Sequence, residues 1–257
     1  VPKNAVVGVV GESGCGKSVT SMSVMRLIQG PAGQIVEGSI RFKAYDYKRD
    51  EKGEPIAKAG GKEGEFEMEE KIYDIAKMPT VDMYRIRGRD ISMIFQEPMT
   101  TLNPVFKIGE QIDEVILLHR KDMSKEEVKA RSIELLDMVG MIDPEAVYKK
   151  YPHELSGGMR QRVVIAMSLA CDPKLIIADE PTTALDVTIQ AQILDMLRDL
   201  KERINSSIML ITHDLGVVYD MADYVVVMYA GKVIEKGTRD EIFNNPCHPY
   251  TVGLMKS

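Results

Sequence analysis

One glycine-rich segment constrains this chain more than any other: residues 11–18 read GESGCGKS and follow the apolar run 5–10. An apolar run that stops at glycine is typical of a buried parallel strand that leads into a turn. The spacing G-x-x-x-x-G-K-[ST] is that of a phosphate-binding loop, which needs a strand before it and a helix after it. We therefore predict a strand over 5–10, a phosphate loop, and a helix over 17–27.

Each residue type in the loop has a role in holding phosphate. The glycines let the backbone turn tightly, so that its N–H groups point at phosphate oxygens near the start of a helix. Lys17 is expected to neutralise the β- and γ-phosphates, and the Ser18 hydroxyl to ligate Mg²⁺. The residues expected to contact ATP in this segment are Gly11, Ser13, Gly14, Cys15, Gly16, Lys17, Ser18 and Val19.

A second apolar run, LIIADE at 175–180, ends in two acidic residues that could bind the metal ion and the attacking water. Successive side chains of a strand point in opposite directions. Asp179 is therefore predicted to face Mg²⁺, and Glu180 to reach the attacking water as general base or water-positioning group. His213 follows the apolar run 207–211 and is expected to bond the γ-phosphate or that water. This chemistry is predicted at the carboxyl ends of parallel strands.

The rest of the chain alternates strands with helices, which indicates an α/β fold with a mainly parallel sheet. Gly38–Phe42 predicts a strand with one wet face. Residues 43–80 carry many charges and little periodicity, so we expect an exposed insertion, either a solvated loop or a surface for a partner. Ser124 and Glu127 form a capping box that starts a helix. Further predicted elements are strand 91–95, a helix ending at Met138, helix 160–170, strand 175–178, helix 187–204, and strands 207–211 and 224–228 with a hairpin through 230–231.

Composition excludes several classes. A net charge of −6 provides no global basic field, so nothing in it indicates a nucleic-acid partner. The longest apolar stretches fall far short of the roughly 20 residues that a membrane-spanning helix requires. Three widely separated cysteines favour free thiols in a reducing compartment. With no visible secretory signal, we expect a cytoplasmic chain.

Residues 155–162, LSGGMRQR, resemble the LSGGQ signature of ABC ATPases. Ser156 with the amides of Gly157 and Gly158 at a helix start is a second anion-binding terminus in one chain. The resemblance implies a head-to-tail dimer, in which these three residues of one subunit cover the γ-phosphate held by the loop of the other. Met159 departs from the usual glutamine, and little loss is expected from that.

The resemblance assigns further roles. Gln96 looks like the Q-loop glutamine, which touches Mg²⁺ and water at the join to a helical subdomain. Asp186 resembles the D-loop aspartate that communicates across the dimer. The implied fold is a P-loop NTPase (RecA-like) core with an α-helical ABC subdomain and a small antiparallel β part. The chain is expected to form one nucleotide-binding domain, 1–257, with core 1–96 and 157–257, insertion 43–80 and helical subdomain 97–156.

Two further segments, 95–104 and 245–251, look like those of dipeptide and oligopeptide importer ATPases, a branch that includes nickel importers. We interpret them as lineage markers and not as ligand sites. The resemblance implies ATP hydrolysis that drives peptide uptake. It also implies a second ATPase subunit, identical or homologous, transmembrane permease subunits, indirectly a solute-binding protein, and a peripheral place on the inner face of the cell membrane.

Two features of that branch are missing from the sequence. No aromatic residue for stacking on adenine precedes Gly11, and the chain ends at Ser257, before the extension that often carries an iron–sulfur cluster. We therefore expect a part of a longer protein with no cluster in it.

The alternative is a non-transport ABC ATPase acting on nucleic acid, which usually carries a long coiled coil or two cassettes. A regulatory GTPase would need an N-K-x-D motif, and an intact Glu180 disfavours a mere ATP sensor.

Overall fold

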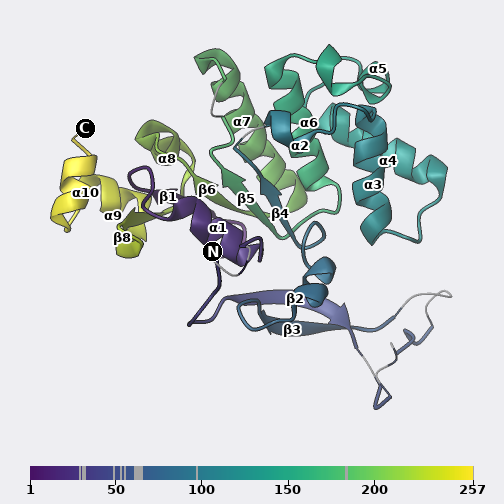
Figure 1. The fold of residues 1–257 in the computed structure, drawn as a ribbon, viewed down its shortest axis with the longest axis horizontal. Coiled ribbons are helices and arrows are strands. Elements are labelled where there is room, and N and C mark those ends of the chain that lie inside the picture. The colour runs from purple at the N-terminus through teal and green to yellow at the C-terminus, as the bar shows by residue number, and fades with distance from the viewer. Residues whose placement is uncertain are drawn as a thin grey trace. The chain divides into compact units, whose positions relative to one another are not determined.

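The chain forms two compact units, Val1–Ser21 with Arg87–Ser257, and Met22–Ile86, each with its own sheet (Figure 1). The computed structural model describes residues 1–28, 30, 33–48, 50–52, 54, 56–60, 66–96, 98–182 and 185–256, and of residues 98 and 99 the backbone alone.

The first unit is built on a six-stranded sheet in the order β4-β5-β6-β1-β7-β8. All neighbouring strands in it are parallel except β7 and β8, which are antiparallel. Every residue of β1, β4 and β6 is buried, as expected for apolar runs of a parallel sheet covered on both faces. The predicted α/β class with a mostly parallel sheet is confirmed. The strands are β1 Val6–Val10, β4 Ile91–Ile94, β5 Leu175–Asp179, β6 Ser207–Ile211, β7 Tyr224–Tyr229 and β8 Lys232–Thr238.

From α4, Lys125–Met138, onward, each α-helix of the first unit begins after a residue whose side chain caps it. The predicted capping box at Ser124 is present, and Asp186 caps the helix predicted over 187–204 with those bounds. The helix predicted over 160–170 instead begins at Gly157, because Ser156 caps it there. The helices of this unit are α2 Pro98–Thr101, α3 Ile108–His119, α4 Lys125–Met138, α5 Pro144–Tyr148, α6 Gly157–Leu169, α7 Val187–Ile204, α8 Leu215–Met221, α9 Arg239–Asn244 and α10 Pro249–Leu254, with a 3-10 turn, η2, at Pro152–Glu154. Helix α1, Lys17–Val24, begins in this unit and ends in the second one.

Helix α1 ends earlier than expected. It stops at Val24, and not at residue 27, because Arg26 adopts a left-handed conformation with φ of 52°. A left-handed residue cannot continue a right-handed helix.

The end of α7 gives a test of backbone chemistry. Asn205 takes the left-handed C-cap conformation, with φ of 55°. Asn and Gly tolerate this conformation, whereas a residue such as alanine, whose β-carbon carries no polar group, is strained in it by about 1 kcal/mol. Asn205→Ala is expected to lower the free energy of unfolding by about that amount, measured as a shift of the urea midpoint. Asn205→Gly is the matched control and should stay within about 0.5 kcal/mol of the unchanged chain. Equal losses in the two variants would contradict this reason.

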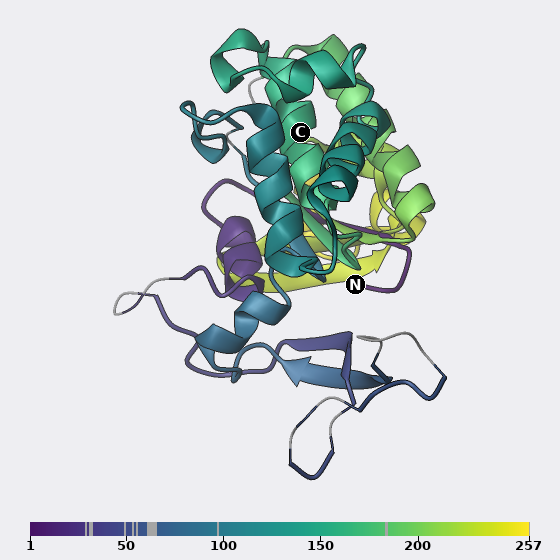
Figure 2. The same ribbon diagram turned by 90° about the vertical axis from the view of Figure 1, so that its right-hand side faces the viewer.

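Helices α3, α4 and α5, which lie between β4 and α6 in the sequence, pack on one another, and both ribbon views show them side by side (Figures 1 and 2). Helices α3 and α4 also contact α6. Ile112, Ile116 and Leu135 are fully buried there and belong to the same core cluster as the sheet. The predicted limits of this helical part, 97–156, stay a prediction, since the two compact units are divided at other residues.

The second unit corrects one expectation about the charged stretch 43–80. A two-stranded antiparallel sheet, β2 Arg41–Tyr47 with β3 Met68–Asp74, occupies much of it, and a 3-10 turn, η1, follows at Thr80–Arg85. The strand period was hidden because the exposed face carries apolar residues such as Tyr45 and Ile72, whereas the charged Asp46 is buried on the other face. On the exposed face, Lys43 pairs with Glu70 at 2.7 Å. Ala44 on the opposite face is fully buried. Residues 49, 53, 55 and 61–65 of the stretch lie outside the described residues.

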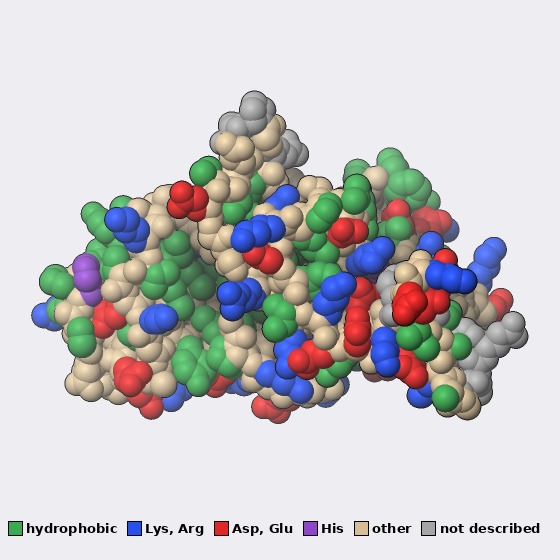
Figure 3. Space-filling model, turned by 90° about the horizontal axis from the view of Figure 1, so that it is seen from below, with side chains coloured by type: hydrophobic (Ala, Val, Ile, Leu, Met, Phe, Trp, Pro, Cys, Tyr) green, Lys and Arg blue, Asp and Glu red, His purple; other side chains and the backbone are tan. Residues whose placement is uncertain are grey.

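The charges on the surface, the hydropathy of the helices and the state of the cysteines agree with what the composition predicts. On the face that Figure 3 shows, basic and acidic side chains are interspersed. Among the described residues, no helix combines the length and the apolar character that a bilayer crossing requires. Cys15, Cys171 and Cys247 are free thiols, as the sequence predicts.

Candidate active site

The carboxyl ends of four neighbouring parallel strands carry the residues that the sequence singles out. Gln96 follows β4, and His213 follows β6. Asp179 is the last residue of β5, and Glu180 is the next. The phosphate loop, 11–18, follows β1. Because these strands are neighbours in the sheet and run in one direction, all five features lie at the same edge.

The phosphate loop closes around the ammonium group of Lys17. Lys17 Nζ donates to Gly11 O at 2.8 Å and to Glu12 O at 2.9 Å, and the residue is only 6% exposed. Gly11 has φ of 152°, and a Cβ on it would lie 2.2 Å from Met228 O at the end of β7. Only glycine therefore fits where the loop leaves the strand.

The other predicted loop contacts differ in their exposure. Ser13 is exposed, as is Val19 at 59%. Cys15 is buried, and its carbonyl accepts a hydrogen bond from Gly231 N at 3.0 Å. The tip of the β7–β8 hairpin thus holds the loop from one side, and the Cys15 thiol faces the interior.

The first turn of α1 meets the acid that ends β5. Ser18 Oγ donates to Asp179 Oδ1 at 3.1 Å, and Ser21 Oγ lies 3.4 Å from Asp179 Oδ2. Burial raises the pKa of the Asp179 carboxyl, and the neighbouring Glu180 carboxylate adds to the rise, whereas the serine hydroxyls and Lys17 oppose it. The serine hydroxyls and Lys17 therefore do not fully offset the cost of burying the negative charge of this carboxylate. A cation bound beside it would therefore be favoured.

Glu180 turns away from its neighbour and faces two other strand ends. Its backbone is left-handed, with φ of 48°, and its N–H donates to Ile211 O at 2.8 Å. Gln96 Nε2 donates to Glu180 Oε2 at 2.9 Å, and His213 Nδ1 lies 3.4 Å from Oε1. The two acids thus have separate partners. A left-handed conformation costs a residue with a β-carbon about 1–2 kcal/mol, and such strain clusters at functional sites.

The signature residues lie at the start of α6, against α7. Ser156 Oγ accepts from Met159 N at 3.4 Å, and a Cβ on Gly158 would lie 2.9 Å from Ile189 Cγ2. Asp186 caps α7 by accepting from Ile189 N at 3.0 Å. Ile189 therefore links the signature to Asp186. The structure places this group beside the first turn of α7, whereas the phosphate loop contacts the β7–β8 hairpin.

Three residues with evident contacts to these parts were missed by the sequence reasoning. Ser21 lies one helical turn beyond Ser18, a spacing that could have revealed it. Gln161, almost fully buried, donates to Pro181 O at 2.6 Å, in the segment directly after Glu180. The Tyr250 hydroxyl accepts from the backbone N–H of Glu12 in the phosphate loop, at 3.0 Å. Residues 245–251 are therefore more than a lineage marker.

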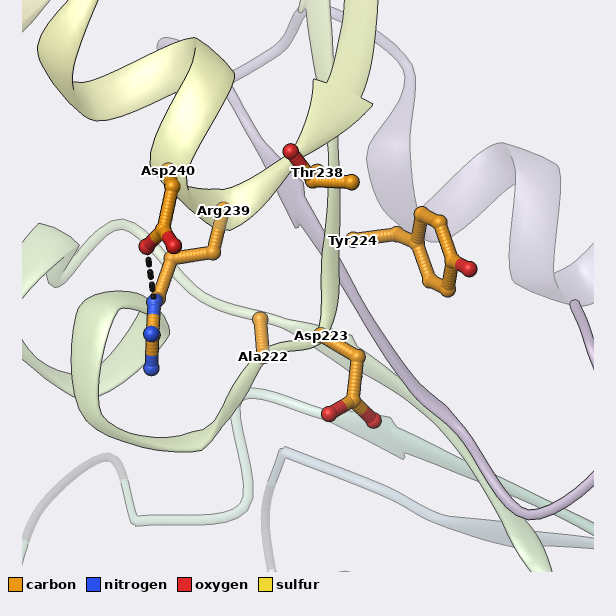
Figure 4. A pocket seen from close by; sticks show the side chains of 6 residues that line it. All are labelled: Ala222, Asp223, Tyr224, Thr238, Arg239 and Asp240. Atoms are coloured by element: carbon orange, nitrogen blue, oxygen red, sulfur yellow. Dashed lines mark hydrogen bonds and ion pairs between the residues drawn. The ribbon is translucent and has the colours of Figure 1, made fainter.

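A pocket of about 200 Å³ lies at the opposite edge of the sheet (Figure 4). It surrounds the amino end of β7, where Asp223 Oδ2 accepts from Val6 N, the first residue of β1, at 2.7 Å. Arg239 Nε donates to Asp240 Oδ1 at 3.0 Å, as the dashed line marks. Arg239 Nη1 also donates to Tyr219 O of α8 at 3.4 Å. Because its polar residues bond other parts of the fold, we assign the pocket a structural role. It is lined by Ala222, Asp223, Tyr224, Thr238, Arg239 and Asp240.

Comparisons with known proteins identify relatives along the whole chain. Residues 1–183 match the family model described as ABC transporter. Oligopeptide transport ATP-binding protein AppD of Bacillus subtilis (strain 168) is 51% identical over 257 residues, 100% of this chain and 70% of the relative. Oligopeptide transport ATP-binding protein OppD of the same strain is 51% identical over 99% of this chain and 63% of its own length. The chain thus spans about two thirds of these relatives.

A solved structure shows the same fold. It is titled as a dimeric, post-hydrolysis state of the ATP-binding cassette MJ0796 bound to ADP and Pi. The TM-score is 0.70 at 24% identity, and the match covers 93% of this chain and 87% of that one.

Proposed function

The chain belongs to the ABC transporter family, and on that premise we propose that it binds and hydrolyses ATP to energise uptake of peptides or related small solutes. The observation that carries this proposal is the contact of Ser18 Oγ with Asp179 Oδ1 at 3.1 Å, which joins the phosphate loop to the acid of β5. Glu180, with its contacts to Gln96 and His213, lies at the same sheet edge. We propose that this edge holds the phosphates, a metal ion and the group that accepts a proton from water, the three parts that nucleoside triphosphate hydrolysis requires.

The phosphate loop is proposed to hold the β- and γ-phosphates. Its backbone N–H groups and the start of α1 favour anions. Lys17 Nζ lies inside the loop, where carbonyls of Gly11 and Glu12 accept from it. Phosphate oxygens would take the place of these acceptors and form stronger, charge-assisted hydrogen bonds.

The residues beside the loop fit a magnesium ion. Mg²⁺ usually takes one or two protein oxygens and completes its shell with phosphate oxygens and water. The Ser18 hydroxyl and the Asp179 carboxylate provide such oxygens in contact with each other, and burial raises the pKa of that carboxyl. Phosphate oxygens and water would complete the shell. The ion would neutralise charge on the phosphates.

Glu180 is proposed to accept the proton of the attacking water. A general base has to lie within hydrogen-bond reach of that water. Gln96 contacts one carboxylate oxygen and His213 the other, so the orientation of the base is set from both sides. The Glu180 side chain is 19% exposed, which leaves a path for a water molecule to it.

A second copy of the chain is proposed to complete the site. The signature residues Ser156, Gly157 and Gly158 form a helix N-terminus with an affinity for anions. Gly158 lies against Ile189 in the first turn of α7. Because one chain carries both halves, two copies related by a two-fold axis would complete two ATP sites reciprocally. Asp186, joined to the signature through Ile189, would lie near that interface.

The transported class and the remaining partners rest on the relatives. Both are named oligopeptide transport ATP-binding proteins, which supports peptides as the cargo of this chain. We propose that permease subunits in the membrane hold the chain as a peripheral subunit on the inner face, and that a solute-binding protein acts with them. Val105 and Phe106, 72% and 51% exposed, follow α2 and offer an apolar surface to the permease close to Gln96 in sequence.

ATP binding is tested directly by Lys17→Ala. Loss of the ammonium removes charge-assisted hydrogen bonds to phosphate, so MgATP affinity is expected to fall by about 10- to 100-fold. Isothermal titration calorimetry measures this. Lys121→Ala, at an exposed lysine after α3, is the control and should bind as the unchanged chain does. Undiminished affinity in the Lys17 variant would refute the proposed phosphate site.

A further inference from the structure

One motif of the sequence has no part in the function proposed so far, the segment NPCHPYT at 245–251. In the structure this segment leads into α10. His248 caps the helix, and its Nδ1 accepts from Tyr250 N at 3.1 Å. The turn therefore fixes the direction in which the Tyr250 side chain leaves the helix.

The segment is fastened to β8 by one carboxylate. Glu235 Oε1 accepts from Cys247 N at 2.6 Å, and Oε2 accepts from His248 N at 3.0 Å. Thr251, in the first turn of α10, is fully buried. These contacts give the first turn of α10 a fixed place relative to the β7–β8 hairpin.

From that place, Tyr250 reaches the phosphate loop. Its hydroxyl accepts from Glu12 N at 3.0 Å across 238 positions of the sequence. Its ring packs on Tyr229 of β7, with centroids 4.6 Å apart and planes at 45°. The hairpin and α10 thus each hold the loop by one hydrogen bond, at Cys15 O from Gly231 N and at Glu12 N to the Tyr250 hydroxyl.

We propose that Tyr250 is a positioning residue for the phosphate loop, and that the segment 245–251 sets the affinity of that loop for ATP. The inference rests on the proposed function, because it assumes that the loop holds phosphate. Tyr250 does not touch the phosphates in this account. It fixes Glu12 next to Gly11, so that the N–H groups further along the loop already point at the anion. The loop then loses less conformational entropy when ATP binds, which raises its affinity.

The expected effect follows from the loss of one hydrogen bond. Tyr250→Phe removes the hydroxyl and keeps the ring against Tyr229. Water can reach the exposed Glu12 amide, so the fold should stand, but the loop loses an anchor. A single hydrogen bond of this kind corresponds to about a fivefold change in an equilibrium constant. The Kd and KM for MgATP are therefore expected to rise about fivefold, with kcat within about twofold of the unchanged chain.

Tyr229→Phe is the matched control. It removes the hydroxyl from the ring of β7 that packs against Tyr250, and it leaves the hydrogen bond between Tyr250 and Glu12 intact. Its Kd for MgATP should stay within about twofold of the unchanged value. Equal Kd values in the Tyr250 and Tyr229 variants would overturn the inference.

Amide hydrogen exchange supplies a readout that does not depend on ATP. The Glu12 amide is expected to exchange faster in Tyr250→Phe than in Tyr229→Phe, measured by NMR on the chain without nucleotide. Unchanged exchange at Glu12 would also overturn the inference. If the unchanged chain binds MgATP and Tyr250→Phe binds it equally well, this inference alone fails. If the unchanged chain does not bind MgATP, the proposed function fails.

Discussion

Replacement of Glu180 by glutamine is expected to reduce ATP turnover by about 10²- to 10⁴-fold while MgATP affinity stays close to that of the unchanged chain. Glutamine keeps the shape of the side chain and one acceptor oxygen, for Gln96 or for His213, but it cannot take a proton from water near neutral pH. The phosphate loop and Asp179 are untouched. Single-turnover phosphate release and calorimetric binding measure the two effects separately.

The control for this change is Glu202→Gln on the exposed face of α7. It removes the same charge away from the sheet edge, so its turnover should equal that of the unchanged chain. A Glu180→Gln variant that keeps more than about a tenth of the turnover would show that another group accepts the proton.

Replacement of Ser156 by aspartate is expected to lower turnover by about 100-fold or more. Aspartate caps a helix as well as serine does, so the start of α6 should be preserved. Its carboxylate would nevertheless stand where the second copy presents a γ-phosphate. Two like charges about 4 Å apart repel by about 4 kcal/mol at an effective dielectric constant near 20, which accounts for a loss of this size.

The control variant Ser156→Asn distinguishes the effect of the added negative charge from an effect on capping of α6. Asparagine is an equally good N-cap and carries no charge, so turnover should fall by less than about tenfold. Thermal denaturation of both variants should match that of the unchanged chain. A loss of activity that is equal in the two variants would assign the effect to geometry at the helix start and contradict the role in phosphate binding.

The sequence predicted those elements whose limits are set by local chemistry. Helix α7 has its predicted bounds because Asp186 caps its start and Asn205 can take a left-handed conformation at its end. The strands β2 and β3 were not predicted over 43–80. These strands pair residues far apart in the sequence, such as Tyr47 with Met68, and pairing of that kind is not written in a local period.

The candidate site shows the same distinction. Gln96, Asp179, Glu180 and His213 could be placed together because they follow strands of one parallel sheet. The left-handed backbone of Glu180 could not be predicted, since it arises where its N–H bonds Ile211 O of the next strand. The contact of Tyr250 with the loop depends on the tertiary path of the chain over 238 positions, which no motif records.

The central claim is that ATP on the loop of one chain is completed by the signature of a second copy. The most direct test is the mass in solution of Glu180→Gln, measured by light scattering with and without MgATP. The account predicts the mass of one chain without nucleotide, the mass of two chains with MgATP, and the mass of one chain in both conditions when Ser156→Asp is added. A Glu180→Gln chain that binds MgATP and still has the mass of one chain would contradict it.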